Sequence, residues 1–265
     1  MSNEFFDDLK FTRIEQDGAL ITIVIDRPEA LNALHPPAHR ELDRIFDYYA
    51  STPELRCAII TASGDRAFCV GNDLKFPSDQ GRDAFPVTGF GGITNRFDLW
   101  KPIIAAVNGF CLGGGLEIVL ACDIAIASET AEFGLPEPRI GYAAIGGGGL
   151  QRLARQLAIK DAMWLALRAR RISAAEALRL KLVNEVVAPE QLRECARSVA
   201  SDILACAPLA IVATKQVLLH SADKPSLAEA MTADHSAVRA MIDSEDAQEG
   251  PAAFAHKRPP RWRGR

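Results

Sequence analysis

The sequence of 265 residues lacks the motifs that mark several common kinds of site. Its six cysteines have no C-x-x-C spacing and form no cluster with histidine at zinc-ligand spacing, so we expect no metal site. No G-x-G-x-x-G follows a predicted strand and no G-x-x-x-x-G-K-[ST] occurs, which disfavours the nucleotide-binding folds that use those loops. No apolar run reaches the length of a membrane span, so we expect no membrane partner.

An excess of basic charge is also absent. The net charge of −4 argues against a nucleic-acid-binding protein. Residues 1–10 carry more acidic than basic side chains, which is the wrong charge for a secretory or mitochondrial leader. Several cysteines lie within apolar runs, as buried reduced thiols do. We therefore expect a cytoplasmic protein, and 265 residues suffice for one large domain or two small ones.

Strands and helices alternate through the first half of the chain. Residues 11–13 and 20–26 predict a hairpin, because the turn signal Asp17-Gly18 separates them. Pro36-Pro37 suits the start of a helix. Apolar runs of strand length occur at 21–26, 57–61, 103–107 and 123–127. Each run leads to or follows a helical pattern, which predicts an α/β fold built from repeated β-β-α units.

Other elements are predicted from local signals. We expect a strand over 67–74, a long mobile surface loop over 75–92 and renewed helical periodicity over 93–100. Later come short strands at 132–134 and 182–187, and helices after the glycine run 146–149, over 159–169, from Ser173, and over 190–205, 208–221 and 226–242. We expect residues 1–195 to form the β-β-α core and residues 196–265 to form a helical region that packs on the core or on a partner subunit.

The stretch from Pro102 to Ala127 has the features of a catalytic turn. An apolar strand leads into Gly113–Gly115, and a helical register follows with Glu117 in its first turn. The first N–H groups of a helix lack internal partners and glycine lets a ligand approach them, so this turn suits a developing oxyanion. Glu117 could instead only stabilise the helix dipole, but that interpretation leaves Glu137, beside another glycine turn, unexplained.

Five motifs stand in order along the chain. They are PEALNAL at 28–34, AFCVGNDL at 67–74, AVNGFCLGGGLE at 106–117, FGLPE at 133–137, and SED at 244–246 leading to Lys257-Arg258. Together they resemble the enoyl-CoA hydratase/isomerase (crotonase) family. The resemblance implies a crotonase-like spiral of β-β-α units with a C-terminal helical trimerisation region, commonly as a homotrimer or homohexamer. It also implies an acyl-CoA substrate and no cofactor beyond the coenzyme A moiety.

The resemblance also assigns roles to residues. It implies that the backbone N–H groups of Asn72 and Gly114 hold the thioester oxygen. Glu117 and Glu137 match the two family glutamates, and the presence of both favours hydration or dehydration over isomerisation alone. Contacts to coenzyme A are implied for Ala30, Asn72, Asp73, Leu74, Lys75, Gly114 and Lys257. Lys257 would contact a phosphate, whereas a basic tail with no ligand would simply be solvated.

Two departures from the family pattern and one further likeness bear on the substrate. Asn72 stands where hydratases usually have a small residue such as alanine, and the loop 141–146 lacks the family's proline and is one residue longer. The loop 75–92 is similar to that of members acting on carnitinyl-CoA. We predict an enoyl-CoA hydratase. The alternatives are an isomerase, a carnitinyl-CoA dehydratase, a hydratase-aldolase or, from another class, a non-catalytic acyl-CoA-binding protein.

Overall fold

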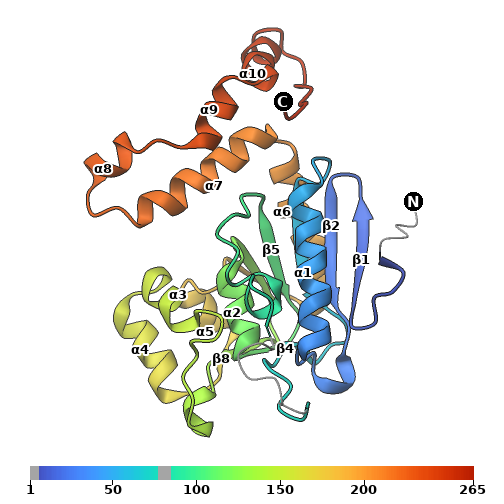
Figure 1. The fold of residues 1–265 in the computed structure, drawn as a ribbon, viewed down its shortest axis with the longest axis vertical. Coiled ribbons are helices and arrows are strands. Elements are labelled where there is room, and N and C mark those ends of the chain that lie inside the picture. Colours follow the sequence, from blue (N-terminus) through green and yellow to red (C-terminus); the bar gives the residue numbers. More distant parts are fainter. Residues whose placement is uncertain (1–5, 77–84) are drawn as a thin grey trace.

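The computed structural model describes residues 6–76 and 85–265, and within them the chain folds into two sheets surrounded by helices (Figure 1). The strands are β1 Thr12–Asp17, β2 Leu20–Ile25, β3 Cys57–Ala62, β4 Ala67–Cys69, β5 Ile103–Val107, β6 Phe110–Leu112, β7 Ile124–Ser128, β8 Glu132–Gly134, β9 Ile172–Ser173 and β10 Glu185–Val187. The helices are α1 Pro36–Ser51, α2 Gly114–Ala121, α3 Gly149–Gln156, α4 Ile159–Arg168, α5 Ala174–Arg179, α6 Leu192–Leu204, α7 Pro208–Ala222, α8 Leu227–Thr232, α9 Ser236–Ile242 and α10 Glu245–Ala255. Short 3-10 turns lie at Pro28–Ala30, Phe90–Gly92, Glu137–Ile140 and Pro189–Gln191.

The larger sheet has the strand order β1-β2-β3-β5-β7-β10. Strands β1 and β2 are antiparallel, with Asp17 opposite Leu20, so the predicted hairpin is confirmed. The other pairs in this sheet are parallel. The four predicted strand-like runs therefore lie side by side as β2, β3, β5 and β7. The smaller sheet has the order β4-β6-β8-β9 and is antiparallel only between β8 and β9.

After the hairpin β1-β2, the strand pairs β3/β4, β5/β6 and β7/β8 each place their first strand in the larger sheet and their second strand in the smaller one. The clearest units are β5, β6 and α2, followed by β7, β8 and α3. This arrangement confirms the predicted α/β fold of repeated units. Strands β6 and β9 were not predicted, because three and two residues are too few to show a periodicity.

Helices cover both faces of the larger sheet. Parallel strands that are buried on both faces consist of continuous apolar runs, and every residue of β2 and β3 is buried. On one face α1 packs through Leu42, Ile45 and Phe46. On the other face α6 packs through Ala196 and Ala200, whose small side chains let the helix lie close to the sheet.

Three predictions around β4 are corrected. The strand predicted over 67–74 is shorter than expected and ends at Cys69, whereas the Gly-Asn turn expected at its end is present, with a positive φ of 95° at Gly71. Residues 93–100 form no helix: Ile93 is buried but Phe97 is 74% exposed, so the predicted apolar spacing does not form one buried face. Part of the loop 75–92 lies outside the described residues; of the described ones, Lys75, Phe76 and Val87 are exposed as expected, whereas Phe90–Gly92 is buried.

The C-terminal helices leave the body of the molecule after α6. Helix α6 spans residue 195 and packs on the larger sheet, whereas α7 to α10 extend beyond it (Figure 1). Lys215 of α7 binds Asp123 beside β7, with Nζ and Oδ2 2.8 Å apart. The helix predicted over 226–242 is interrupted at 233–235, where His235 stacks on His220, and α10 lies in the predicted helical region 196–265, where no separate range was predicted for it.

Within the described residues no single helix has both the length and the apolar composition to cross a membrane. The segments Pro189–Leu204 and Pro208–Ala222 reach that composition only as a pair, and the pair is bent by 102°.

Candidate active site

Two glycine turns meet at the start of α2. A Cβ atom at Gly71 would lie 3.2 Å from the Gly114 nitrogen, so the turn after β4 lies directly against the turn before α2. Gly114 is the first residue of α2, and its N–H lacks a partner inside the helix. Neither this N–H nor that of Asn72 hydrogen-bonds to any described residue. Two free backbone donors beside a helix N-terminus can stabilise an oxyanion.

An isolated parallel β-bridge to the segment before α1 orients the Asn72 N–H. The Leu34 N–H donates to the Gly71 carbonyl oxygen and the Asp73 N–H donates to the Leu34 carbonyl oxygen, both at 2.8 Å. In such a parallel bridge the backbone groups of the middle residue point to the opposite side. The N–H of Asn72 therefore points away from Leu34.

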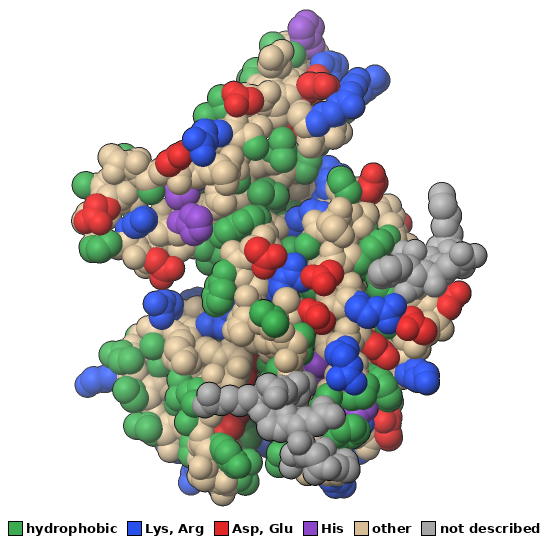
Figure 2. Space-filling model, in the orientation of Figure 1, with side chains coloured by type: hydrophobic (Ala, Val, Ile, Leu, Met, Phe, Trp, Pro, Cys, Tyr) green, Lys and Arg blue, Asp and Glu red, His purple; other side chains and the backbone are tan. Residues whose placement is uncertain are grey.

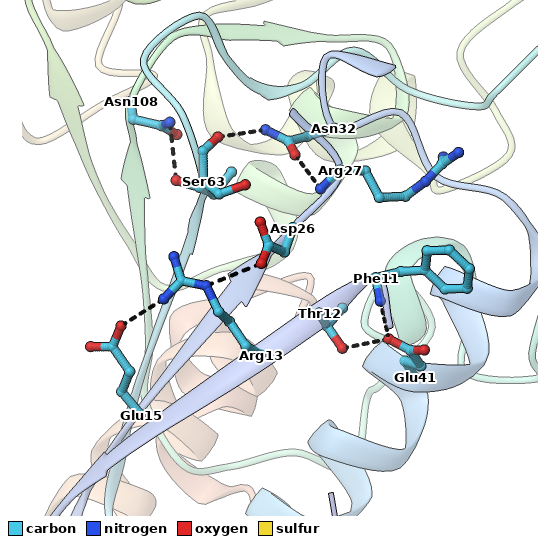
Figure 3. Close-up of polar contacts among 11 residues, drawn as sticks. Phe11, Thr12, Arg13, Glu15, Asp26, Arg27, Asn32, Glu41, Ser63 and Asn108 are labelled. Carbon is cyan, nitrogen blue, oxygen red and sulfur yellow. Dashed lines mark hydrogen bonds and ion pairs between the residues drawn. The ribbon is translucent and has the colours of Figure 1, made fainter. Parts of the chain in front are cut away.

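Arg27 and Asn32 fix the segment that makes this bridge. Arg27 Nη2 donates to Asp73 Oδ2 at 3.0 Å, and Arg27 Nη1 donates to the Ala33 carbonyl oxygen. Figure 3 shows Asn32 between Arg27 and Ser63: its Oδ1 accepts the Arg27 N–H and its Nδ2 donates to the Ser63 carbonyl oxygen. Burial would raise the pKa of Asp73, but the hydrogen bonds from Arg27 and from the Lys75 N–H outweigh burial and hold that pKa below its ordinary value.

Glu117 is enclosed by the glycine run that precedes α3. It lies in the first turn of α2, as predicted, and is 4% exposed. Its Oε1 accepts the Gly149 N–H at 2.9 Å. A Cβ atom at Gly147 would lie 2.7 Å from Glu117 Oε2, so any other residue there would displace the carboxylate. Arg152 Nη1 donates to the Gly147 carbonyl oxygen at 2.8 Å and holds the run in place.

Glu137 reaches the same place from the other side. It begins the 3-10 turn after β8, and a Cβ atom at Gly113 would lie 2.9 Å from its Oε1. Its Oε2 is buried and has no hydrogen-bond partner among the described residues. The carboxylate therefore lies against the oxyanion turn with one oxygen unoccupied. Two carboxylates and two free N–H groups from three separate segments converge here: the turn after β4, the first turn of α2 and the 3-10 turn after β8.

Comparison with known proteins identifies the family to which the chain belongs. Residues 15–265 match the enoyl-CoA hydratase/isomerase family. The chain belongs to that family. It is 41% identical over 254 residues to the carnitinyl-CoA dehydratase of Proteus mirabilis (strain HI4320), covering 94% of this chain and 96% of the relative. It is 39% identical over 253 residues to the (E)-benzylidenesuccinyl-CoA hydratase of Thauera aromatica, covering 95% and 98%.

Solved structures agree with this assignment. The enoyl-CoA hydratase from Mycobacterium tuberculosis H37Rv matches with a TM-score of 0.89 and 36% identity, covering 96% of this chain and 99% of the other. The crotonase-like fold predicted from the motifs is confirmed. This member of the enoyl-CoA hydratase/isomerase family is an enzyme of the hydratase type.

In this family member most of the predicted coenzyme A contacts lie beside the oxyanion turn. Ala30 ends the 3-10 turn that Arg27 ties to Asp73. Leu74 and Lys75 follow on the surface, where the Lys75 N–H donates to Asp73 Oδ1 at 3.1 Å. The structure thus brings together every predicted contact except Lys257.

Lys257 lies after α10, at the opposite end of the chain's fold from α2 and β4 (Figure 1). The tail that follows it is not simply solvated. The buried carboxylate of Asp246 accepts the N–H groups of Arg263 and Gly264 at 2.7 and 2.8 Å, and Glu249 binds Arg258 through both oxygens. A single chain therefore does not bring Lys257 to the site.

Sequence reasoning missed several residues that shape the site. The run at 146–149 was predicted only to open a helix, yet it encloses Glu117. Phe90, which packs on Gly114, was predicted only to lie in the loop. Arg152 has no sequence signal, because nothing local shows which carbonyl oxygen it binds. No group of three or more His, Cys, Asp or Glu side chains in the described ranges is arranged to hold a metal ion.

The surroundings of Glu137 predict that it destabilises the fold when ionised. Burial raises the pKa of Glu137, its own backbone N–H lowers it in part, and the charge of Glu117 raises it again. Since the folded state binds this proton more tightly than the unfolded chain, stability falls as pH rises from about 4.5 through the raised pKa. We expect Glu137→Gln to have a thermal midpoint at pH 7 at or above that of the wild type. Thermal unfolding between pH 4 and 8 checks this, and a less stable variant at pH 7 would contradict it.

Proposed function

We propose that this enzyme reversibly adds water across the 2,3 double bond of an acyl-CoA thioester. The observation that supports the proposal is the convergence of two unpartnered N–H groups with two glutamates within the described part of the chain. The N–H groups of Asn72 and Gly114 would hold the thioester oxygen, which makes the third carbon of the acyl group electrophilic and stabilises the enolate formed on attack.

The two glutamates suit different roles in this reaction. Glu117, held by the Gly149 N–H, would orient the water and take its proton. Glu137 has a raised pKa and a free oxygen, and would deliver a proton to the second carbon of the acyl group. Paired carboxylates in unlike surroundings divide acid and base work in this way. The proposed chemistry uses no metal, and no cofactor other than the coenzyme A moiety of the substrate.

The same residues catalyse elimination in the reverse direction. Similarity to a carnitinyl-CoA dehydratase makes 3-hydroxyacyl-CoA thioesters, carnitinyl-CoA among them, substrates to test beside the enoyl forms. The decisive experiment is turnover of a panel of saturated, 2-enoyl, 3-enoyl, 3-hydroxy, carnitinyl and aryl thioesters, with identification of each product. Conversion of 3-enoyl thioesters alone would favour an isomerase, and release of an aldehyde would favour a hydratase-aldolase.

We also propose that residues 196–265 assemble the protein as a homotrimer or homohexamer. Large apolar side chains are exposed on α4 and on the C-terminal helices, and Figure 2 shows those over α4 at its lower left. They include Ile159, Met163, Trp164 and Leu167 on α4, and Leu218, Leu227, Met231 and Phe254 on α7, α8 and α10. Clusters of exposed apolar side chains mark interaction surfaces, and a second copy could also bring Lys257 to a neighbour's site.

Sedimentation equilibrium at micromolar concentration should therefore show three or six copies. Deletion of residues 208–265 should leave smaller species, because it removes α7 to α10 but keeps the α6 contacts with the sheet. A monomeric wild type at these concentrations would overturn the assembly proposal.

A further inference from the structure

The segment Gly89–Gly92 is wedged between α1 and α2. Gly89, Gly91 and Gly92 have φ values of 86°, 63° and 67°, the region that favours glycine. A Cβ atom at Gly91 would lie 2.8 Å from Ile118 of α2, and one at Gly92 would lie 2.5 Å from the Asp43 nitrogen of α1. Phe90 is thus the only side chain that the segment carries, and at Gly92 the backbone of α1 leaves no room for another.

The ring of Phe90 lies on the oxyanion turn. A Cβ atom at Gly114 would lie 2.3 Å from Phe90 Cζ, and Phe90 is 4% exposed. The ring therefore covers the α-carbon whose N–H is proposed to hold the thioester oxygen. With the thioester oxygen bound at Gly114 as proposed above, the acyl carbon next to the carbonyl would lie close to this ring.

His39 of α1 holds the segment that carries Phe90. Its side chain is fully buried, and its Nδ1 accepts the Gly91 N–H at 3.0 Å. The imidazole meets the Phe90 ring edge to face, with ring centres 4.6 Å apart, and meets Phe85 in the same way at 5.0 Å. Burial lowers the pKa of His39 to about 3, so the ring stays neutral and Nδ1 stays an acceptor near neutral pH.

Core packing alone does not explain a histidine at this position. Because Nδ1 accepts a hydrogen bond, the proton of the neutral ring is on Nε2. Nε2 is buried and has no hydrogen-bond partner among the described residues. An aliphatic side chain would fill the space with no unpaired donor. What the imidazole adds is an acceptor for Gly91 and an edge against Phe90.

We propose that His39 is a specificity-determining positioning residue: by binding the Gly91 N–H it holds Phe90 on Gly114 and so excludes acyl groups branched at the carbon next to the thioester carbonyl. The inference rests on the proposed function, in which Gly114 binds the thioester oxygen. Its substrate class is acyl-CoA thioesters that are unbranched at that carbon.

The test compares 2-butenoyl-CoA with 2-methyl-2-butenoyl-CoA. We expect Phe90→Ala to raise the ratio of kcat/KM for the branched over the unbranched thioester by about tenfold or more, the effect of accommodating one methyl group. His39→Leu should raise the ratio in the same direction, because the Gly91 N–H loses its acceptor. Inhibition by free coenzyme A should stay unchanged in each variant.

A matched pair of variants separates positioning from packing. The Oδ1 of asparagine overlays Nδ1 of histidine, so His39→Asn should keep the wild-type ratio. The polar atoms of glutamine overlay Nε2 instead, so His39→Gln should raise the ratio and serves if His39→Leu does not fold. Equal losses on both thioesters in His39→Leu and His39→Gln, with the ratio unchanged, would overturn the proposal. A change of the ratio in Phe90→Ala, with no change in His39→Leu or His39→Gln, would also overturn the proposal.

A binding measurement keeps this inference separate from the proposed reaction. Dissociation constants of butanoyl-CoA and 2-methylbutanoyl-CoA need no turnover. Their ratio should shift in the same variants and in the same direction. If the wild type hydrates no thioester but the binding ratio shifts, the proposed reaction fails and the role of His39 stands. An unchanged binding ratio in an active enzyme overturns the role of His39 alone.

Discussion

Gly114→Pro should lower kcat by about 10²–10³-fold, the usual cost of losing one oxyanion-hole donor. The substitution removes the N–H at the first position of α2, where proline's fixed φ fits a helix and no helical hydrogen bond is lost. The KM for the thioester should change less than kcat, because the interaction strengthens as charge develops on the oxygen. Steady-state kinetics with the best thioester from the substrate panel measures both values.

A side chain at position 114 has a second effect that must be separated from loss of the donor. A Cβ atom there would lie 2.3–2.7 Å from three carbons of the Phe90 ring, so the ring must move. Gly114→Ala causes the same displacement and keeps the N–H, which makes it the matched control. The proline variant should be slower than the alanine variant by at least the donor's contribution, because proline also places Cδ where the amide hydrogen was. Equal rates in the two folded variants would show that the Gly114 N–H does not hold the oxyanion.

The repeated units were predictable because their signals are local. The runs that became β2, β3, β5 and β7 are apolar and of strand length, as expected for strands covered on both faces. Ser173 was expected to cap a helix, and its Oγ accepts the Glu176 N–H at 3.2 Å. The helix expected over 93–100 does not form, because an apolar period forms a helix only where another element covers it, and that is not a local signal.

The site was predictable in part. Motifs indicated Asn72, Gly114, Glu117 and Glu137, and the fold places them together. The sequence could not show that Gly147 and Gly149 enclose Glu117, or that Phe90 lies on Gly114, because these contacts depend on how distant segments cross. It also could not show where Lys257 lies, since that depends on the path of α7 to α10.

Glu117→Gln should nearly abolish hydration of a 2-enoyl-CoA and spare any isomerisation of a 3-enoyl-CoA. Hydration needs one group to activate water and another to protonate carbon, whereas moving a double bond needs one group that carries a proton. The amide oxygen of the glutamine introduced by Glu117→Gln can still accept the Gly149 N–H, so the fold around it should persist. Glu137→Gln should lower both activities. A general acid or base contributes about 10²–10⁴-fold, so the contrast is measurable.

Glu132→Gln is the matched control, because Glu132 lies on β8 five residues before Glu137 but pairs with Arg171 at the surface. It should leave both activities within about twofold of the wild type, as expected for an exposed ion pair. The pH profile adds a second check: the raised pKa of Glu137 should appear as a limb of kcat that is absent in Glu137→Gln. Small and equal losses in the Glu117 and Glu137 variants would show that the two carboxylates are not the catalytic pair, even though they meet at one turn.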